Sequence, residues 1–517
     1  MKINNVLIIK GLASQYGVLN DFSNAIADEL KNLSVNVTTF DFNLDTNDPN
    51  NLLALNQSYD LVFSFNAILL DTLDSIINNP NTLIWSFLVD HPYHLHARLL
   101  KKCNNHIVSC VDKNHVSYVK TYYPNIENVF FVPHGGDGVF EAHKPFDQRE
   151  YNVCLMGTYK NTDSLINKLS ALPEPDKSIA TAIVNHLTQG SKLTIEQLLY
   201  LELSKRNINI PKSAFANLLS ALLFIDVSIR ANNRKLILDK LTSEGITVDV
   251  FGNGWEGYKC EHPEHLRIHQ NVPYQEALSI MSNAKIVLNP LPLFRNGSHE
   301  RVFSSMFCGA LCLSEINTYL SEQFTHGEDI VFFDMNDLES LVTNIKLLLS
   351  NQELSQKICQ NGYKKASDNH LWKHRAKEIL DIANSVYEKQ LYASESITIT
   401  NNTDLEFNHI INYIKFNSAK LLTDKMKAIF SYYEMVNPTY ADAILRKLTE
   451  NKLWPIEDFE GDIYCSNVIN DLKEHIDDYI SLYNTYSDIT SKKALVRMIE
   501  NKLCFSFDDL RNTTSPL

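Results

Sequence analysis

The sequence of 517 residues has little that would attach it to nucleic acid or to a membrane. Its 47 Lys and Arg are outnumbered by 61 Asp and Glu, which gives a formal net charge of -14. Because nucleic acid and anionic membrane surfaces are themselves negative, this balance opposes non-specific binding to either. No apolar run approaches the length of a transmembrane helix, and the apolar run near the amino terminus is too short for a signal peptide. We therefore expect a soluble, cytoplasmic protein without a nucleic-acid partner.

Paired cysteines and several catalytic motifs are also missing. The nine cysteines include no Cys-x-x-Cys pair, and Cys154, Cys308 and Cys312 lie in apolar runs, which is typical of buried reduced thiols. The Gly-x-Ser-x-Gly motif of serine hydrolases and the Gly-x-x-x-x-Gly-Lys-Ser/Thr phosphate loop are both absent. His94 and His96 do not share a helical face at a spacing of two, so we expect no zinc site and no metal.

What the chain does contain is short apolar runs that alternate with helical patterns. With 44% hydrophobic and 21% charged residues, the composition is that of a globular protein, and the length suggests three domains. The alternation predicts two Rossmann-like α/β domains with parallel sheets. Strands are expected at 5–10, 35–40, 61–65, 82–88, 106–111 and 128–132, and then at 151–156, 247–251, 266–269, 285–289, 311–314 and 330–333.

The predicted domains have unequal helical additions. We expect a first α/β domain at 1–140 and a second at 141–390, interrupted after its first strand by a helical insertion at about 162–233. Helices are expected at 337–350, 352–367 and 372–389. A linker rich in Ser, Thr and Asn at 393–404 lies within a helical carboxyl-terminal region at 391–517, for which the sequence indicates no role.

The most informative stretch runs from Asn283 to Glu315 and reads as strand, polar loop, helix and second strand. Ser298 stands where an N-cap belongs, and Glu300 lies in the first helical turn. Free N–H groups at a helix start favour a phosphate, to which Arg295 and Arg301 would add charged hydrogen bonds. An ordinary surface helix explains the same pattern. The residues expected at a ligand here are Asn289, Arg295, Gly297, Ser298, His299, Glu300 and Arg301.

Further polar groups follow the other predicted strands, where parallel sheets bind ligands. Asp90 and His91 end one strand, so that His91 is a candidate general base oriented by Asp90; alternatively, it caps the turn before Pro92. His134 precedes Gly135 and Gly136, which allow a close approach of the backbone, and it is either a second catalytic candidate or a satisfied hinge histidine.

The second domain offers a parallel set of candidates after its own strands. Gly157 and Lys160 follow the first strand, although a lysine there is also typical of a solvated surface. The run Gly252, Asn253, Gly254 and Trp255 follows the next strand and forms either a diphosphate-binding loop with an aromatic wall or a tight turn with a core tryptophan. Tyr274 is a candidate for stacking on a nucleobase, or it is simply packed.

Four segments of the chain resemble a known family. NVFFVPHGGDGVF (128–140) resembles the interdomain hinge of GT-B glycosyltransferases. RKLILDKLTSEGITVDVFGNGWEGY (234–258), NVPYQEALSIMSNAKIVLNP and HERVFSSMFCGALCLSE are similar to the carboxyl-terminal domain of CgeB-like glycosyltransferases, in the group 1 family. The resemblance implies a nucleotide-diphosphate sugar held mainly by the second domain, an acceptor at the first, and no metal or other cofactor. The acceptor would be a glycan, a lipid-linked precursor or a protein.

The chain departs from this resemblance at one point. Related retaining enzymes hold the donor with two glutamates eight positions apart, and the matching positions here are Asn296 and Ser304. Glu300, four residues before Ser304 on the same helix, is a candidate replacement for the ribose contact. The alternative is a catalytically inactive scaffold that binds a nucleotide sugar or a carbohydrate.

Overall fold

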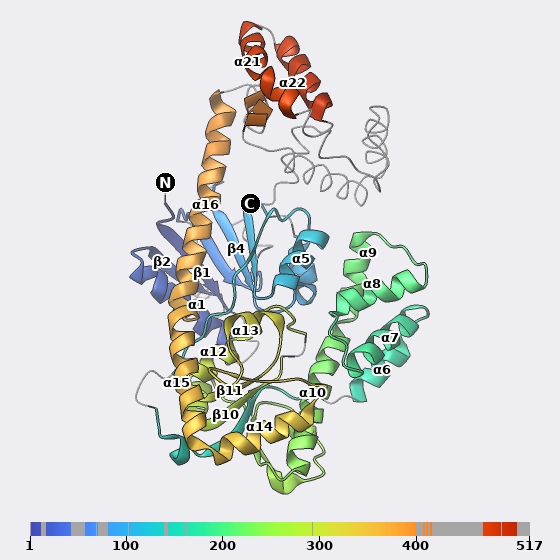
Figure 1. Cartoon of the computed structure of the whole chain (residues 1–517), viewed down its shortest axis with the longest axis vertical. Helices are drawn as coiled ribbons and strands as arrows, with labels where there is room; N and C mark the ends of the chain where they lie inside the picture. The colour runs from blue at the N-terminus through green and yellow to red at the C-terminus, as the bar shows by residue number, and fades with distance from the viewer. Residues whose placement is uncertain are drawn as a thin grey trace. The chain divides into compact units, whose positions relative to one another are not determined.

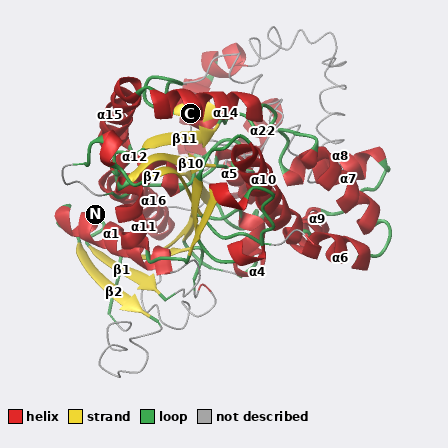
Figure 2. Cartoon of the chain, turned by 90° about the horizontal axis from the view of Figure 1, so that it is seen from below, coloured by secondary structure: helices red, strands yellow, loops and turns green. Residues whose placement is uncertain are grey.

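Two parallel sheets organise the first of two compact units, residues 1–388, and the second unit covers residues 389–517. The computed structural model describes residues 2–11, 17–42, 57–68, 70, 81–101, 103–138, 143–160, 163–291, 293–399, 407–408, 410–411, 414–415, 469–486 and 489–503. In Figure 1 the two sheets lie within the first unit, and Figure 2 shows helices on both sides of their strands.

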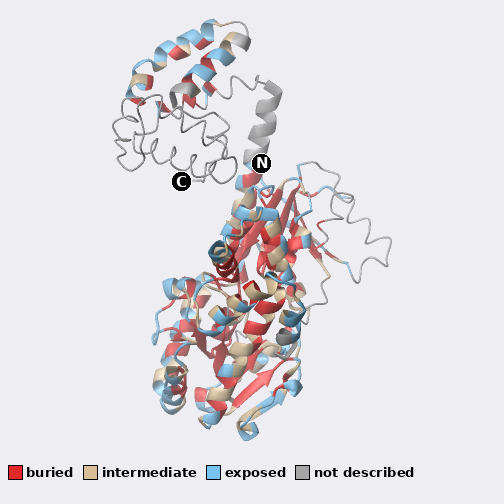
Figure 3. Cartoon of the chain, turned by 90° about the vertical axis from the view of Figure 1, so that its right-hand side faces the viewer, coloured by how far each residue is buried: buried red, intermediate tan, exposed pale blue. Residues whose placement is uncertain are grey.

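The first sheet has six parallel strands in the order β2-β1-β3-β4-β5-β6. The strands are β1 (Asn5–Lys10), β2 (Asn36–Asp41), β3 (Leu61–Phe65), β4 (Leu83–Leu88), β5 (His106–Cys110) and β6 (Asn128–Phe131). Every residue of β3, β4 and β5 is buried, as expected for strands covered on both faces. Figure 3 shows the strands as the buried centre of the unit. Helices α1 (Val18–Asn32), α4 (His96–Leu99) and α5 (Lys113–Tyr122), with the turn η3 (Pro92–Leu95), connect them.

The second sheet repeats this plan with six parallel strands in the order β12-β11-β10-β7-β8-β9. The strands are β7 (Tyr151–Met156), β8 (Val248–Phe251), β9 (Leu266–His269), β10 (Ala284–Asn289), β11 (Leu311–Glu315) and β12 (Val331–Phe333). Its helices and turns are η4 (Phe146–Gln148), η5 (Trp255–Gly257), η6 (Pro263–His265), α11 (Tyr274–Ser282), α12 (Glu300–Phe307), α13 (Thr318–Gln323), α14 (Leu338–Ser350) and α15 (Gln352–Asn369). The predicted α/β fold with two Rossmann-like sheets is therefore confirmed.

A group of helices stands between β7 and β8, where the insertion was predicted. It consists of α6 (Asp163–Ala171), α7 (Asp176–Thr188), α8 (Ile195–Lys205), α9 (Lys212–Ala221) and α10 (Leu223–Ser243), and it lies beside both sheets in Figure 1. Its apolar residues, among them Leu199, Phe215 and Ile225, join one continuous cluster with Leu88, Val108 and other residues of the first sheet. The insertion therefore packs against the first domain, although in the sequence it lies between two strands of the second domain.

The last helix of the first unit connects the domains again. Helix α16 (Trp372–Ile399) begins beside Gly135, and Asn384 on it accepts a hydrogen bond from the backbone of Ile3 at 2.7 Å. The helix continues to Ile399, so the predicted linker at 393–404 is wrong for 393–399, and 400–404 lie outside the described residues. In the second unit the structure describes α21 (Ile476–Thr485) and α22 (Ile489–Leu503). The predicted domain boundaries stay a prediction.

Three further features belong to the described part of the chain. Cys154, Cys308 and Cys312 are buried thiols that form no disulfide among the described residues, as predicted. No single helix there is long and apolar enough to cross a membrane, and only the bent pair α9 and α10 together reaches that length and composition. No described group of three or more His, Cys, Asp or Glu is placed to hold a metal ion.

Candidate functional site

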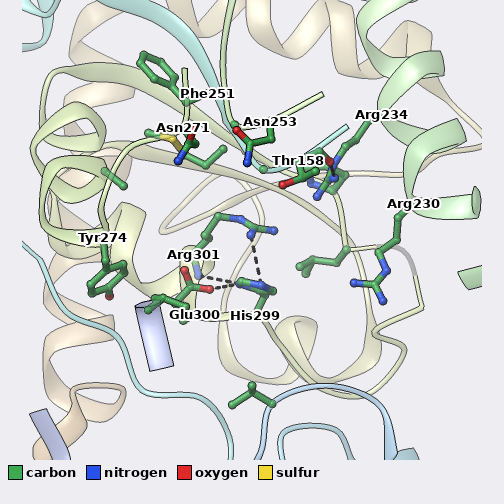
Figure 4. Close-up of a pocket in the computed structure, with 18 of the residues that line it drawn as sticks. Thr158, Arg230, Arg234, Phe251, Asn253, Asn271, Tyr274, His299, Glu300 and Arg301 are labelled. Carbon is green, nitrogen blue, oxygen red and sulfur yellow. Dashed lines mark hydrogen bonds and ion pairs between the residues drawn. The ribbon is translucent and has the colours of Figure 1, made fainter. Parts of the chain in front are cut away.

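A cavity of about 570 Å³ opens where the carboxyl ends of the two sheets face each other. The first domain contributes Asp90 after β4 and His134 after β6. The second contributes Gly157 after β7, Asn253 after β8, and residues 299–301 at the start of α12. Figure 4 shows side chains from both the second sheet and the insertion pointing into this space. Strand ends of both domains thus form one site.

The start of α12 brings a helix N-terminus into the cavity. Its N-cap is His299, whose Nδ1 accepts a hydrogen bond from the backbone N–H of Arg301 at 3.4 Å. Ser298 is not the cap, which corrects the prediction. Its Oγ donates to the carbonyl of His299 at 3.1 Å, and its backbone N–H bonds the carbonyl of Val111. A β-bridge between Gly297 and Asp112 holds this backbone against the first domain, so the helix begins one residue later.

Glu300 places a carboxylate beside the cap. Its side chain is 7% exposed and lies against the His299 ring. Burial alone would raise the pKa of Glu300, but His299 and Arg301 outweigh it and lower the pKa to about 2. The carboxylate is therefore ionised at neutral pH, and it lines the cavity next to Arg301.

Arginines from the insertion add positive charge that the sequence analysis missed. Arg230 and Arg234 on α10 line the cavity with Arg301 and Lys160, and in Figure 4 the three guanidinium groups point toward the same space. The guanidinium of Arg234 donates to the carbonyl of Thr158. The available signal was the spacing of Arg230 and Arg234, since residues four apart share one helical face.

Glycines at the strand ends allow the backbones after β7 and β8 to interlock. Gly252 has φ +146°, and a Cβ there would lie 2.4 Å from the carbonyl oxygen of Gly157. Gly254 has φ +83° and would bring a Cβ within 2.1 Å of the carbonyl of Tyr159. Both positions therefore require glycine. Gly157, Gly252 and Asn253 line the cavity, whereas Gly254 supports the turn behind it.

Trp255 belongs to the core rather than to the cavity wall, which corrects the first of its two interpretations. It is 0% exposed, its indole N–H donates to the carbonyl of Gly157 at 2.8 Å, and its ring stacks on Tyr159. The aromatic wall is instead formed by Phe251, which stacks on His269, and by Tyr274. The hydroxyl of Tyr274 lies 3.3 Å from Ser304 Oγ, and its ring packs edge-on against Phe22.

Some predicted ligand residues are directed elsewhere. Arg295 lies 3.8 Å from a carboxylate oxygen of Glu315 and donates to the carbonyl of Ser191 at 3.1 Å. Asn289 is fully buried, and its Nδ2 contacts the sulfur of Cys312 at 3.5 Å. The described residues that line the cavity do not include Asn289, Arg295, Gly297 or Ser298. They hold the loop in place, and their predicted contact with a ligand stays a prediction.

The side chains of Asp90 and His91, which follow β4, lie in different surroundings. Asp90 lines the cavity and accepts a hydrogen bond from Asn66 Nδ2 at 3.0 Å. His91 is not among the described lining residues. Its Nδ1 accepts from the backbone N–H of Tyr93 at 3.3 Å, its ring stacks on Tyr93, and its Nε2 lies 3.5 Å from Glu196. The structure therefore favours the turn-capping role of His91, and its role as a general base stays a prediction.

His134, in the predicted hinge after β6, lines the cavity. It is 2% exposed, and its Nδ1 has no hydrogen-bond partner within the described part of the chain. Burial lowers the pKa of His134 to about 3, and the nearby Glu300 carboxylate only partly opposes this. The imidazole is thus neutral at physiological pH and offers a ring nitrogen to a polar ligand rather than a group that exchanges protons.

Part of the sequence that forms this site matches a known protein family. Residues 230–381 match the sequence profile of the family described as "Glycosyl transferase-like". This part of the chain is similar to that family. The match covers Arg230, Arg234, the α12 N-terminus and most of the second sheet. It confirms the predicted glycosyltransferase class. No curated protein matches the sequence significantly.

Solved structures align with the chain at low identity. The Anabaena protein Alr3699/HepE in complex with UDP and glucose shares 11% identity, with a TM-score of 0.43, over 74% of this chain and 100% of its own. An alpha-glucosyltransferase in complex with UDP and a 13-mer DNA shares 13%, with a TM-score of 0.42, over 73% and 99%. Sucrose-phosphate synthase from Thermosynechococcus elongatus shares 11%, with a TM-score of 0.41, over 76% and 100%. These TM-scores are all below 0.5, so our assignment of the fold rests on the strand order of the two sheets and not on these alignments.

Proposed function

We propose that the cavity binds a nucleotide-diphosphate sugar and that the enzyme transfers its sugar to an acceptor hydroxyl. The observation that carries the proposal is that Arg234 and Arg301 point into one cavity, which Lys160 also lines and to which α12 brings its N-terminus. A diphosphate carries concentrated negative charge, and a helix start with arginines is its usual protein partner. In a chain of net charge -14, the site thus brings several cationic side chains together.

The remaining lining residues divide into a nucleoside end and a sugar end. Phe251 and Asn271 lie together on one side of the cavity, with Tyr274 nearer Glu300, and they supply aromatic and amide groups for a base. Glu300 supplies an ionised carboxylate for hydroxyl groups of the ribose or the sugar, in place of the glutamates missing at Asn296 and Ser304. His134 is neutral and its Nδ1 has no hydrogen-bond partner among the described residues, so it suits a sugar hydroxyl.

The transfer step requires a base and a stabilised leaving group. The acceptor oxygen forms a bond to the anomeric carbon while the bond from that carbon to the diphosphate oxygen breaks, and its electrons go to the diphosphate. Asp90, on the first-domain side, takes up the hydroxyl proton, and the arginines neutralise the diphosphate. Because cationic side chains supply that charge, we propose that no metal or other cofactor is needed.

The finer assignments belong to the same proposal. We place the protein in the CgeB-like group, in the cytoplasm, with a glycan, lipid-linked or protein acceptor at the first-domain side of the cavity. The inactive-scaffold alternative is disfavoured because a carboxylate from each domain, Asp90 and Glu300, lines the cavity.

A thermal-shift panel of UDP-, GDP-, ADP- and CDP-sugars tests the donor directly. At least one nucleotide sugar should raise the melting temperature in a concentration-dependent way, because a ligand that binds only the folded state stabilises it. If none does so at millimolar concentration, the proposed donor site is wrong.

A further inference from the structure

The helical insertion makes polar contacts with one short segment of the first domain. This segment, residues 91–96, follows Asp90 directly and meets three different helices of the insertion. It meets α8 through His91 Nε2 and Glu196 at 3.5 Å, α10 through His94 Nε2 and Asp226 at 2.6 Å, and α9 through His96 Nε2 and Asn217 at 2.8 Å. The insertion is thereby fixed to the domain that carries the proposed base.

Asp226 is the most connected group of this interface. Its side chain is 4% exposed, and it accepts hydrogen bonds from the Tyr93 hydroxyl at 2.8 Å, from His94 at 2.6 Å and from the guanidinium of Arg230. A buried carboxylate is tolerated only when it is paired in this way. Burial would raise the pKa of Asp226, but Arg230 and His94 outweigh it and hold the pKa far below its usual range.

Arg230 lies one helical turn after Asp226 and reaches the cavity. It lines that cavity with Asp90 and Arg301, and Figure 4 shows its guanidinium directed into the same space as that of Arg301. Because Nε of Arg230 donates a hydrogen bond to Asp226, the carboxylate fixes the orientation of the planar guanidinium from the side that faces away from the cavity. Asp226, Tyr93 and His94 all lie outside the family match at 230–381, so this support is contributed by other parts of the chain.

We propose that Arg230 is a further ligand of the donor diphosphate, and that Asp226 and His94 are positioning residues that aim it and connect donor binding to the first domain. This inference rests on the proposed function of the cavity. It assigns the insertion a part in donor recognition, because the insertion's own carboxylate holds the arginine and the first domain completes the carboxylate's hydrogen bonds.

The test compares Asp226 with a matched carboxylate in the same insertion. Glu202 on α8 is 4% exposed and also pairs with an arginine four residues later, Arg206, and with a histidine, His186. It is not among the described residues that line the cavity. Affinities for UDP, GDP, ADP and CDP and for the corresponding nucleosides are measured by calorimetry in the full-length wild type and in Arg230→Gln, Arg230→Lys, Asp226→Asn and Glu202→Gln, with the melting temperature of each.

Arg230→Gln should weaken binding of the preferred diphosphate about tenfold or more and leave binding of its nucleoside unchanged, with Arg230→Lys intermediate. Asp226→Asn should shift the diphosphate-to-nucleoside affinity ratio in the same direction, and a double Asp226→Asn/Arg230→Gln variant should lose little more than Arg230→Gln alone. Glu202→Gln should lower the melting temperature without changing the ratio.

An unchanged ratio in Arg230→Gln overturns the assignment of Arg230 while leaving the donor site intact. A ratio in Asp226→Asn that matches Glu202→Gln, with only the melting temperature lowered, overturns the positioning role. If the wild type binds no diphosphate better than its nucleoside, both the proposed function and this inference are wrong.

Discussion

Arg295 and Arg301 lie six residues apart yet serve different purposes. Arg295 faces Glu315 and the Ser191 carbonyl, whereas Arg301 lines the cavity at the N-terminus of α12. Arg301→Gln should lower affinity for the nucleoside diphosphate by about 2 kcal/mol, because charged hydrogen bonds to phosphate are lost, and should leave nucleoside affinity unchanged. Calorimetric titration measures both affinities.

Arg295→Gln is the matched control for that change. It removes the partner of a buried carboxylate outside the cavity, so it should reduce thermal stability while the preference for diphosphate over nucleoside remains. Equal losses of diphosphate and nucleoside affinity in Arg301→Gln would remove this residue from phosphate recognition.

Asp90 and His91 give a second prediction at the scale of the residue. Asp90 lines the cavity, while His91 caps the following turn. Asp90→Asn should reduce the transfer rate about a hundredfold or more at unchanged donor affinity, as expected for loss of a general base. His91→Gln should keep most of the turnover and lower the melting temperature. Steady-state rates with a common donor decide between the two, and the reverse order would restore His91 as the base.

At the scale of the element, the turns after β7 and β8 depend on each other. Gly252→Ala would place a Cβ 2.4 Å from the Gly157 carbonyl oxygen, at a φ of +146°. We expect a loss of roughly 1–3 kcal/mol of stability and weaker donor binding, because the turn must shift. Gly257→Ala, where a Cβ meets nothing within 4 Å, should change neither property by much. Chemical denaturation and donor titration of both variants test this, and equal behaviour would refute the interlock.

Elements were easier to predict from the sequence than the contacts of their side chains. All twelve strands that the structure describes begin and end within one residue of their predicted positions, because short apolar runs bounded by polar turns have few alternatives in a parallel sheet. The start of α12 was displaced by one residue because a contact with Asp112, distant in sequence, holds Gly297. Local patterns carry no information about such a contact.

The site shows the same division between local and long-range information. The strand-end residues Asp90, His134, Gly157 and Asn253 were found because parallel strands bring their carboxyl ends together. Arg230 and Arg234 were missed because their place depends on how the insertion packs against both sheets. Trp255 and Arg295 were assigned to the ligand because nothing local distinguishes a side chain that faces a cavity from one that faces a core.

At the scale of the whole molecule, buried histidines predict sensitivity to acid. Burial lowers the pKa of His106 to about 4 and the pKa values of His134 and His370 to about 3. In the unfolded chain each titrates near 6.5, so between these values the unfolded state binds more protons and folding stability falls as pH falls. The pKa of Glu300 is lowered to about 2, so its contribution to folding stability is also lost as the pH falls below the unfolded-state pKa near 4.5.

Each such histidine contributes up to about 1.4 kcal/mol per pH unit to the slope of stability below pH 6.5. His106 is outside the cavity lining and bonds Ser86 at 2.9 Å, so His106→Gln should reduce this slope by about one proton without affecting donor binding. Urea unfolding between pH 4.5 and 7.5 measures the slope. An identical slope in His106→Gln would show that this histidine is not buried in its neutral form.

The most direct test of a nucleotide-sugar transferase is release of nucleoside diphosphate from its donor. The wild-type protein, incubated with the nucleotide sugar that gives the largest thermal shift, should release the diphosphate slowly without acceptor, and Arg301→Gln should release it at least tenfold more slowly at the same donor concentration. Binding of the donor without any release of diphosphate, in the wild type and across the acceptor classes, would contradict catalysis and leave a binding scaffold.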